Sequence, residues 1–148
     1  MTEDPFNLQR FVSAQNPGGT YDHALAELRR GRKTSHWMWF VFPQIAGLGQ
    51  SSMSRTYAIA SLDEAKAYLR HPVLGPRLVD CAATVAASDA PTAAHIFGGI
   101  DTQKLQSSMT LFVRADPAQS VFQHVLDKYF DGQPDAATDR LLSAAPPT

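Results

Sequence analysis

Apolar residues recur every three or four positions along most of this chain, the spacing that places side chains on one face of an α-helix. The clearest stripe follows Asp116 and Pro117 and consists of Val121, Phe122, Val125, Leu126 and Tyr129. An earlier stripe consists of Tyr21, Ala24, Leu25 and Leu28. We find no internal repeat and no run of alternating polar and apolar residues long enough for a convincing strand. The pattern therefore predicts an all-α fold.

Capping residues predict where several helices begin. Asp4 precedes Pro5, and this pair predicts a helix start because Asp accepts hydrogen bonds from free amides and Pro at the first position forfeits none. Ser61 with Glu64 three residues later forms a capping box. Such signals divide the chain into roughly eight to nine short helices joined by short loops.

Glycines predict the ends of other helices. Gly31 suits the left-handed residue that closes a helix, after Arg29 and Arg30 in the last turn, where cations complement the helix dipole. The pair Gly98 and Gly99 is expected to stop a short helix and to separate it from a longer one capped by Asp101. That longer helix carries the apolar stripe of Leu105, Met109 and Phe112.

The segment from Trp37 to Phe42 is almost wholly apolar and holds both tryptophans. Aromatic side chains of this size dominate the core that they enter. We expect a short helix that Pro43 ends, because no other segment offers a partner strand and an unpaired buried strand would leave backbone groups unsatisfied. The fold expected is one compact domain over residues 1–148, packed around this segment, with an ordered core at 4–142 and a frayed tail at 144–148.

Composition excludes several classes of protein. The 148 residues are 44% hydrophobic and 18% charged, which is ordinary for a globular domain. A net charge of -1 supplies no overall field for nucleic acid, so broad nucleic-acid binding is not expected. No apolar run approaches the roughly 20 residues that cross a bilayer, and no membrane association is expected. The acidic N-terminus has no apolar signal region and Cys81 has no partner cysteine, so we expect a cytoplasmic protein. The thiol of Cys81 is expected to be inert, because no adjacent His or cation lowers its pKa.

Three runs resemble the signature blocks of a bacterial family of unknown function, DUF-1810: GRKTSHWMWFVFPQIAGLGQSS, YAIASLDEAKAYLRHPVLGPRL and DTQKLQSSMTLF. The resemblance covers the chain from Phe6 to about Leu142 and implies a compact all-helical fold. It implies no reaction, although some members carry the label calpastatin. Two blocks of the second half, HPVLGPRLVD and DTQKLQSSMTLF, are also faintly similar to helical domains that act on ADP-ribose-linked substrates.

Several polar residues of these blocks form a candidate binding site for a small anionic ligand. Cations with amide and hydroxyl donors suit a phosphate or a carboxylate, and an aromatic ring can stack on a base. The candidate ligand-binding residues are Lys33, His36, Trp39, Gln44, Tyr57, Lys104 and Ser108. The alternative is a solvated basic face with capping serines, which is the commoner role of such a cluster.

His36 is the best catalytic candidate, because it lies between a basic patch and the aromatic segment, where histidines often exchange protons. The alternative for His36 is a core histidine bonded to a backbone carbonyl. The other histidines show no metal-site spacing, and a single cysteine excludes the usual zinc clusters, so neither a metal nor a cofactor is expected.

Two functions fit these observations. The first is binding of a nucleotide-like ligand, such as ADP-ribose or an NAD-related compound, with or without catalysis. The second is a non-enzymatic module for protein–protein interaction or self-association, which predicts that Trp37 or Phe40 is exposed in an apolar patch. The first requires the tryptophan segment and the helix with Lys104 to share one cavity. The sequence leaves the oligomeric state open.

Overall fold

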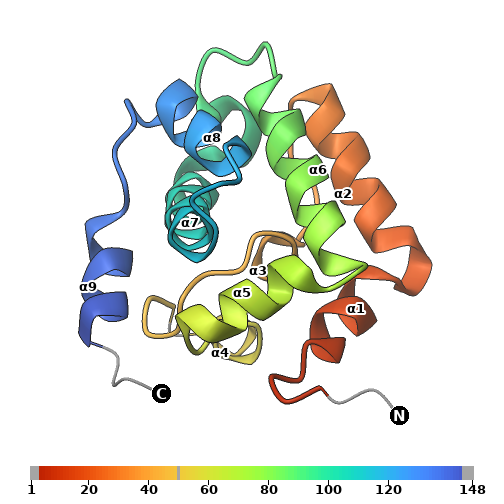
Figure 1. Cartoon of the computed structure of the whole chain (residues 1–148). Coiled ribbons are helices and arrows are strands. Elements are labelled where there is room, and N and C mark those ends of the chain that lie inside the picture. The colour runs from red at the N-terminus through yellow and green to blue at the C-terminus, as the bar shows by residue number, and fades with distance from the viewer. Residues whose placement is uncertain (1–3, 50, 145–148) are drawn as a thin grey trace.

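The computed structural model of the chain describes residues 4–49 and 51–144. Within these ranges the structure is helical without a β-strand, which confirms the all-α prediction (Figure 1). Between α1 and α2 lies one 3-10 turn, Pro17–Gly19. The α-helices are α1 (Gln9–Gln15), α2 (Thr20–Arg30), α3 (Met38–Val41), α4 (Ser52–Thr56), α5 (Leu62–Arg70), α6 (Leu74–Ala86), α7 (Ala93–Ala115), α8 (Val121–Tyr129) and α9 (Ala136–Ala144).

No helix in the described part of the chain is long and apolar enough to cross a membrane. The frayed tail expected at 144–148 lies outside the described residues except for the backbone of Ala144, which closes α9.

The capping signals place several helix boundaries correctly. Gly31 closes α2 in the left-handed conformation, with φ 76°. Ser61 accepts a hydrogen bond from the backbone N–H of Glu64 at 3.1 Å and begins α5. The carboxylate of Glu64 in turn accepts from the N–H of Ala60 at 2.9 Å, one residue earlier than in the usual capping box.

The helix start predicted at Asp4 is wrong, since α1 begins at Gln9. The Asp4 carboxylate does accept from the backbone N–H groups of Leu8 at 2.7 Å and Gln9 at 2.9 Å. Asn7, which lies between Asp4 and Leu8, has a left-handed backbone conformation with φ 52°, and the helix therefore begins one turn later.

The second correction concerns Asp101, which caps no helix. α7 continues through this position and contains one non-helical residue, Gly98, with φ 77° and ψ -178°. Gly98 therefore breaks the helical path, as the sequence predicts, but the chain resumes helical geometry directly after it. This leaves the Asp101 carboxylate free to pair with side chains.

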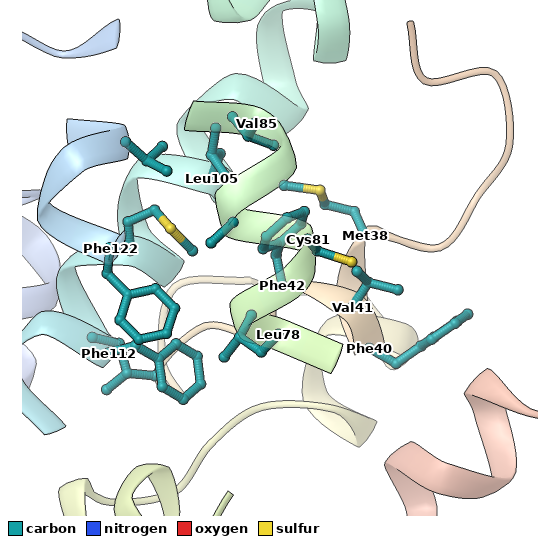
Figure 2. Packing of buried hydrophobic residues seen from close by; sticks show 14 of the residues in the cluster. Met38, Phe40, Val41, Phe42, Leu78, Cys81, Val85, Leu105, Phe112 and Phe122 are labelled. Carbon is teal, nitrogen blue, oxygen red and sulfur yellow. The ribbon is translucent and has the colours of Figure 1, made fainter. Parts of the chain in front are cut away.

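The core forms around α3, α6, α7 and α8, as the aromatic segment predicts. Figure 2 shows Met38 of α3, and Phe42 directly after α3, against the face of α6 that carries Cys81. In the same core the rings of Phe112 on α7 and Phe122 on α8 pack at 5.7 Å between centroids (Figure 2). The largest side chains with under 2% exposure include Trp37, Tyr68, Phe11, Phe42, Phe112 and Phe122.

Candidate functional site

The loop between α2 and α3 is held by a buried carboxylate. Glu27 of α2 is 4% exposed. One of its oxygens, Oε1, accepts from the backbone N–H of Thr34 at 2.7 Å, from that of Ser35 at 3.0 Å and from the indole N–H of Trp37 at 3.0 Å. The other, Oε2, accepts from the Ser35 hydroxyl at 2.7 Å. Glu27 therefore fixes the entry to the aromatic segment.

The same contacts determine the charge state of Glu27. Burial by itself raises the pKa of this carboxyl, but the hydrogen bonds from Ser35, Thr34 and Trp37 outweigh it and lower the pKa to about 2. Nothing in the sequence distinguishes Glu27, which there is simply an acidic position on an amphipathic helix.

Asp101 brings the two signature segments together. Its Oδ2 lies 2.9 Å from the Lys33 ammonium, and its Oδ1 lies 3.6 Å from that of Lys104. The Lys33 ammonium also stands 5.1 Å from the centroid of the Trp37 ring, and the Lys104 ammonium 5.1 Å from that of Trp39. The tryptophan segment and α7 thus share an edge, on which one carboxylate joins two lysines.

Three of the candidate residues line one small pocket, which we call the Trp39 pocket. It has a volume of about 200 Å³. Its lining residues are Trp39, Gln44, Ile45, Ala46, Gly47, Gly49, Ser54, Arg55, Tyr57 and Ala58. Arg55 is not among the site residues predicted from the sequence.

An isolated parallel bridge shapes the Trp39 pocket. The backbone N–H of Ile59 donates to the carbonyl of Gln44, and the N–H of Ala46 donates to the carbonyl of Ile59, both at 2.8 Å. This pairing brings the segment after α3 against the segment after α4. At Gly49 a Cβ atom would lie 2.3 Å from the Cβ of Ser54, so this wall of the pocket requires glycine.

The polar groups that line the Trp39 pocket have unused hydrogen-bonding capacity. Among the described residues, no partner exists for the indole N–H of Trp39, the side-chain amide of Gln44, the guanidinium of Arg55 or the hydroxyl of Tyr57. Tyr57 is nevertheless fixed, because its ring packs against Phe40 at 5.4 Å between centroids. The residues that line the pocket therefore carry one cation, one amide and two hydrogen-bond donors on aromatic rings that are not paired with a described residue.

The other four candidate residues, Lys33, His36, Lys104 and Ser108, line no part of the Trp39 pocket. The pocket is therefore not the cavity expected between the tryptophan segment and the helix of Lys104. His36 is exposed, lines no part of the pocket and makes no hydrogen bond to a described residue, so it is not a core histidine bonded to a carbonyl. Ser108 is 0% exposed, and its hydroxyl has no partner among the described groups. The described residues also contain no cluster of three His, Cys, Asp or Glu side chains arranged to hold a metal ion.

Comparison with known proteins identifies the family of this chain. No curated protein matches the chain. The crystal structure of the conserved hypothetical protein Rv1873 from Mycobacterium tuberculosis superposes with a TM-score of 0.92 and 50% sequence identity. The match covers 96% of this chain and 100% of the mycobacterial one. The family model for proteins of unknown function DUF1810 matches residues 5–142, and the chain belongs to that family.

Proposed function

We propose that the protein binds a small, anionic, nucleotide-like ligand in the Trp39 pocket. The observation that carries this proposal is the set of unpaired polar groups on Trp39, Gln44, Arg55 and Tyr57 around one cavity. Polar side chains placed around an apolar wall in this way fix the orientation of a small ligand.

Each group has a distinct role in the proposal. The ring of Trp39 stacks on the base, and its indole N–H or the Gln44 amide bonds to the base edge. The Arg55 guanidinium binds a phosphate, which matches the planar fork of an arginine. Lys104 lies over the Trp39 ring at 5.1 Å, beside the pocket, where Asp101 at 3.6 Å offsets part of its charge.

The volume of about 200 Å³ limits how much of a ligand is enclosed. A base and its adjoining ribose are the parts that this pocket encloses in the proposal, while a phosphate extends toward the exposed Arg55. Adenosine monophosphate, ADP-ribose and NAD share that portion, so they form the first panel of ligands. A cytoplasmic location belongs to the same proposal and is supported by the lone, buried Cys81.

The test is thermal stability and Trp fluorescence of the full chain with each of the three ligands. A ligand present at 100 times its Kd raises the free energy of unfolding by about 2.7 kcal/mol. Loss of fluorescence on binding is expected, because a stacked base quenches one of the two tryptophans of the chain. No response from a folded protein to any of the three would contradict the proposal.

Two substitutions localise the binding. We expect Arg55→Gln to weaken binding of the phosphorylated ligands by about tenfold or more, through the loss of a charge-assisted hydrogen bond. Tyr57→Phe keeps the ring packed against Phe40 and removes only the hydroxyl. Arg70→Gln is the matched control, since Arg70 is exposed on α5 and lines no part of the pocket. Equal affinity in all three variants would place the ligand elsewhere.

The interaction-module hypothesis receives less support. It expects an exposed Trp37 or Phe40, and these side chains are 1% and 6% exposed. Sedimentation of the isolated chain remains its direct measurement.

A further inference from the structure

A second and larger cavity lies between the C-terminal end of α2 and the segment that joins α6 to α7, at the top of Figure 1. It is an open cleft of about 1040 Å³, which we call the α2–α7 cleft. Its cationic lining residues are Arg29, Arg30, Arg32 and Lys33. Asp89 is the one acidic residue among the described residues that line it. The protein has a net charge of -1, so this cleft concentrates positive charge that the molecule as a whole does not carry.

The positive charge of the α2–α7 cleft that is not paired with an acidic side chain lies on three arginines. Arg29, Arg30 and Arg32 are exposed, and none makes a hydrogen bond or an ion pair through its side chain with a described residue. Lys33 is different, because its ammonium pairs with Asp101 at 2.9 Å and its side chain is 8% exposed. The guanidinium groups, rather than the lysine, are therefore available to a ligand.

The wall opposite the arginines is fixed before any ligand binds. The ammonium of Lys128 on α8 donates to the carbonyl of Ala86 at 2.9 Å and also to that of Ser88. The hydroxyl of Tyr129 donates to the carbonyl of Ala90 at 3.0 Å. These contacts anchor the segment between α6 and α7, and a preformed wall lowers the entropy lost on binding.

We propose that the α2–α7 cleft is a second anion site, for ligands that carry two or more adjacent phosphoryl groups. Arg29, Arg30 and Arg32 fall within four consecutive positions at the C-terminal end of α2, so three planar forks start from one short stretch of backbone. Such close cations match the charge density of linked phosphates. In an extended acidic peptide, carboxylates on one side are about 6.6 Å apart, a poorer match to the arginines.

The first experiment is titration calorimetry of the full chain at fixed ionic strength with inorganic tripolyphosphate, pyrophosphate, orthophosphate and hexaglutamate. We expect tripolyphosphate and pyrophosphate to bind at least about tenfold more tightly than orthophosphate, since each added phosphoryl group gains charge-assisted contacts. Hexaglutamate is expected to bind no better than orthophosphate. Hexaglutamate equal to tripolyphosphate, or orthophosphate equal to both linked phosphates, would overturn the proposal.

Substitutions then assign the binding to the cleft. The triple change Arg29→Gln, Arg30→Gln and Arg32→Gln should weaken tripolyphosphate binding by at least about tenfold. Arg55→Gln and Arg70→Gln should leave it unchanged, and this separates the cleft from the Trp39 pocket. A loss of tripolyphosphate binding in Arg55→Gln with no loss in the triple variant would overturn the proposal, whatever ligand the Trp39 pocket holds.

Asp89→Asn provides a test that misfolding cannot imitate. Asp89 is exposed and, like the arginines, makes no side-chain hydrogen bond with a described residue, so its replacement should leave the fold intact. Removing this negative charge from the lining should tighten tripolyphosphate binding by about twofold or more, because the Asp89 carboxylate no longer repels the phosphate anion. The effect is small because salt screens charges at the surface. Unchanged or weaker binding in Asp89→Asn would contradict binding in the cleft.

Discussion

The indole N–H of Trp37 donates to the buried carboxylate of Glu27 at 3.0 Å, whereas the indole N–H of Trp39 has no partner among the described residues. Both tryptophans belong to the same short segment. Trp37 is 1% exposed and completes the core, while Trp39 is partly exposed and lines a pocket. Two tryptophans separated by one residue thus divide into a structural residue and a candidate binding residue.

Replacement of Glu27 by Gln should destabilise the protein strongly. The carboxylate accepts four hydrogen bonds, and an amide in its place would direct an NH₂ group at backbone and indole donors. We expect a loss of about 2–4 kcal/mol in the free energy of unfolding, measured by urea denaturation. Asp22→Asn on the same helix is the control, since Asp22 is exposed and should change stability by about 0.5 kcal/mol or less. Equal stability of the two variants would contradict this role of Glu27.

The contribution of Glu27 should also depend on pH. The pKa of its carboxyl falls from 4.5 to about 2 on folding, so the folded protein binds the proton less tightly than the unfolded chain. The stabilisation is therefore complete above about pH 4.5 and is lost as the pH falls toward 2. Measured from pH 7 to pH 3, the stability difference between wild type and Glu27→Gln should shrink below pH 4.5. A difference that stays constant over this range would show that the carboxylate charge is not what stabilises the loop.

The neighbouring glycines of α7 should respond to alanine in opposite directions. Gly98 has φ 77° and ψ -178°, a conformation that alanine adopts only with strain, so Gly98→Ala should cost about 1–3 kcal/mol. Gly99 is helical and has no atom within 4 Å of a Cβ position, so Gly99→Ala should gain about 0.4–1 kcal/mol by restricting the unfolded chain. Thermal unfolding of both variants measures the contrast. The same sign of change in both would contradict the break at Gly98.

Local signals in the sequence were sufficient for the helices and for several of their ends. Gly31 and the pair Ser61 and Glu64 act on residues within one turn, and the structure shows these caps. Asp4 misleads because the left-handed Asn7 intervenes. Asp101 misleads because its partner Lys33 is far away in the sequence, and a local pattern cannot distinguish a capping carboxylate from one in a long-range ion pair.

The candidate site is less accessible to sequence reasoning than the helices. Trp39, Gln44 and Tyr57 can be predicted from the sequence, because they are aromatic or polar residues of a signature block. Arg55 joins them only because one backbone bridge places the segment after α4 against the segment after α3. Ser108 has the residue type of a ligand-binding side chain and is fully buried. The apolar stripe of Leu105, Met109 and Phe112 already points to burial of Ser108, which lies three residues after Leu105 and four before Phe112.

Cys81 should be unreactive in the folded protein. Burial raises the pKa of its thiol to about 12, so almost no thiolate is present at neutral pH. We expect the single cysteine to react with a thiol reagent at pH 8 only at the rate at which the protein opens, and to react fully in denaturant. Fast reaction of the native protein would show that α6 exposes this face of the core.

Phe112 should be one of the residues on which stability most depends. Its ring is 0% exposed and lies between those of Tyr68 and Phe122, at 5.5 and 5.7 Å between centroids. Phe112→Ala leaves a cavity where α5, α7 and α8 meet, and should lower the free energy of unfolding by about 3–5 kcal/mol. Ile100→Ala on the same helix is the control, because Ile100 is 75% exposed and should change stability by about 0.5 kcal/mol or less. Urea denaturation that gave similar losses for both variants would mean that the core does not depend on this aromatic stack.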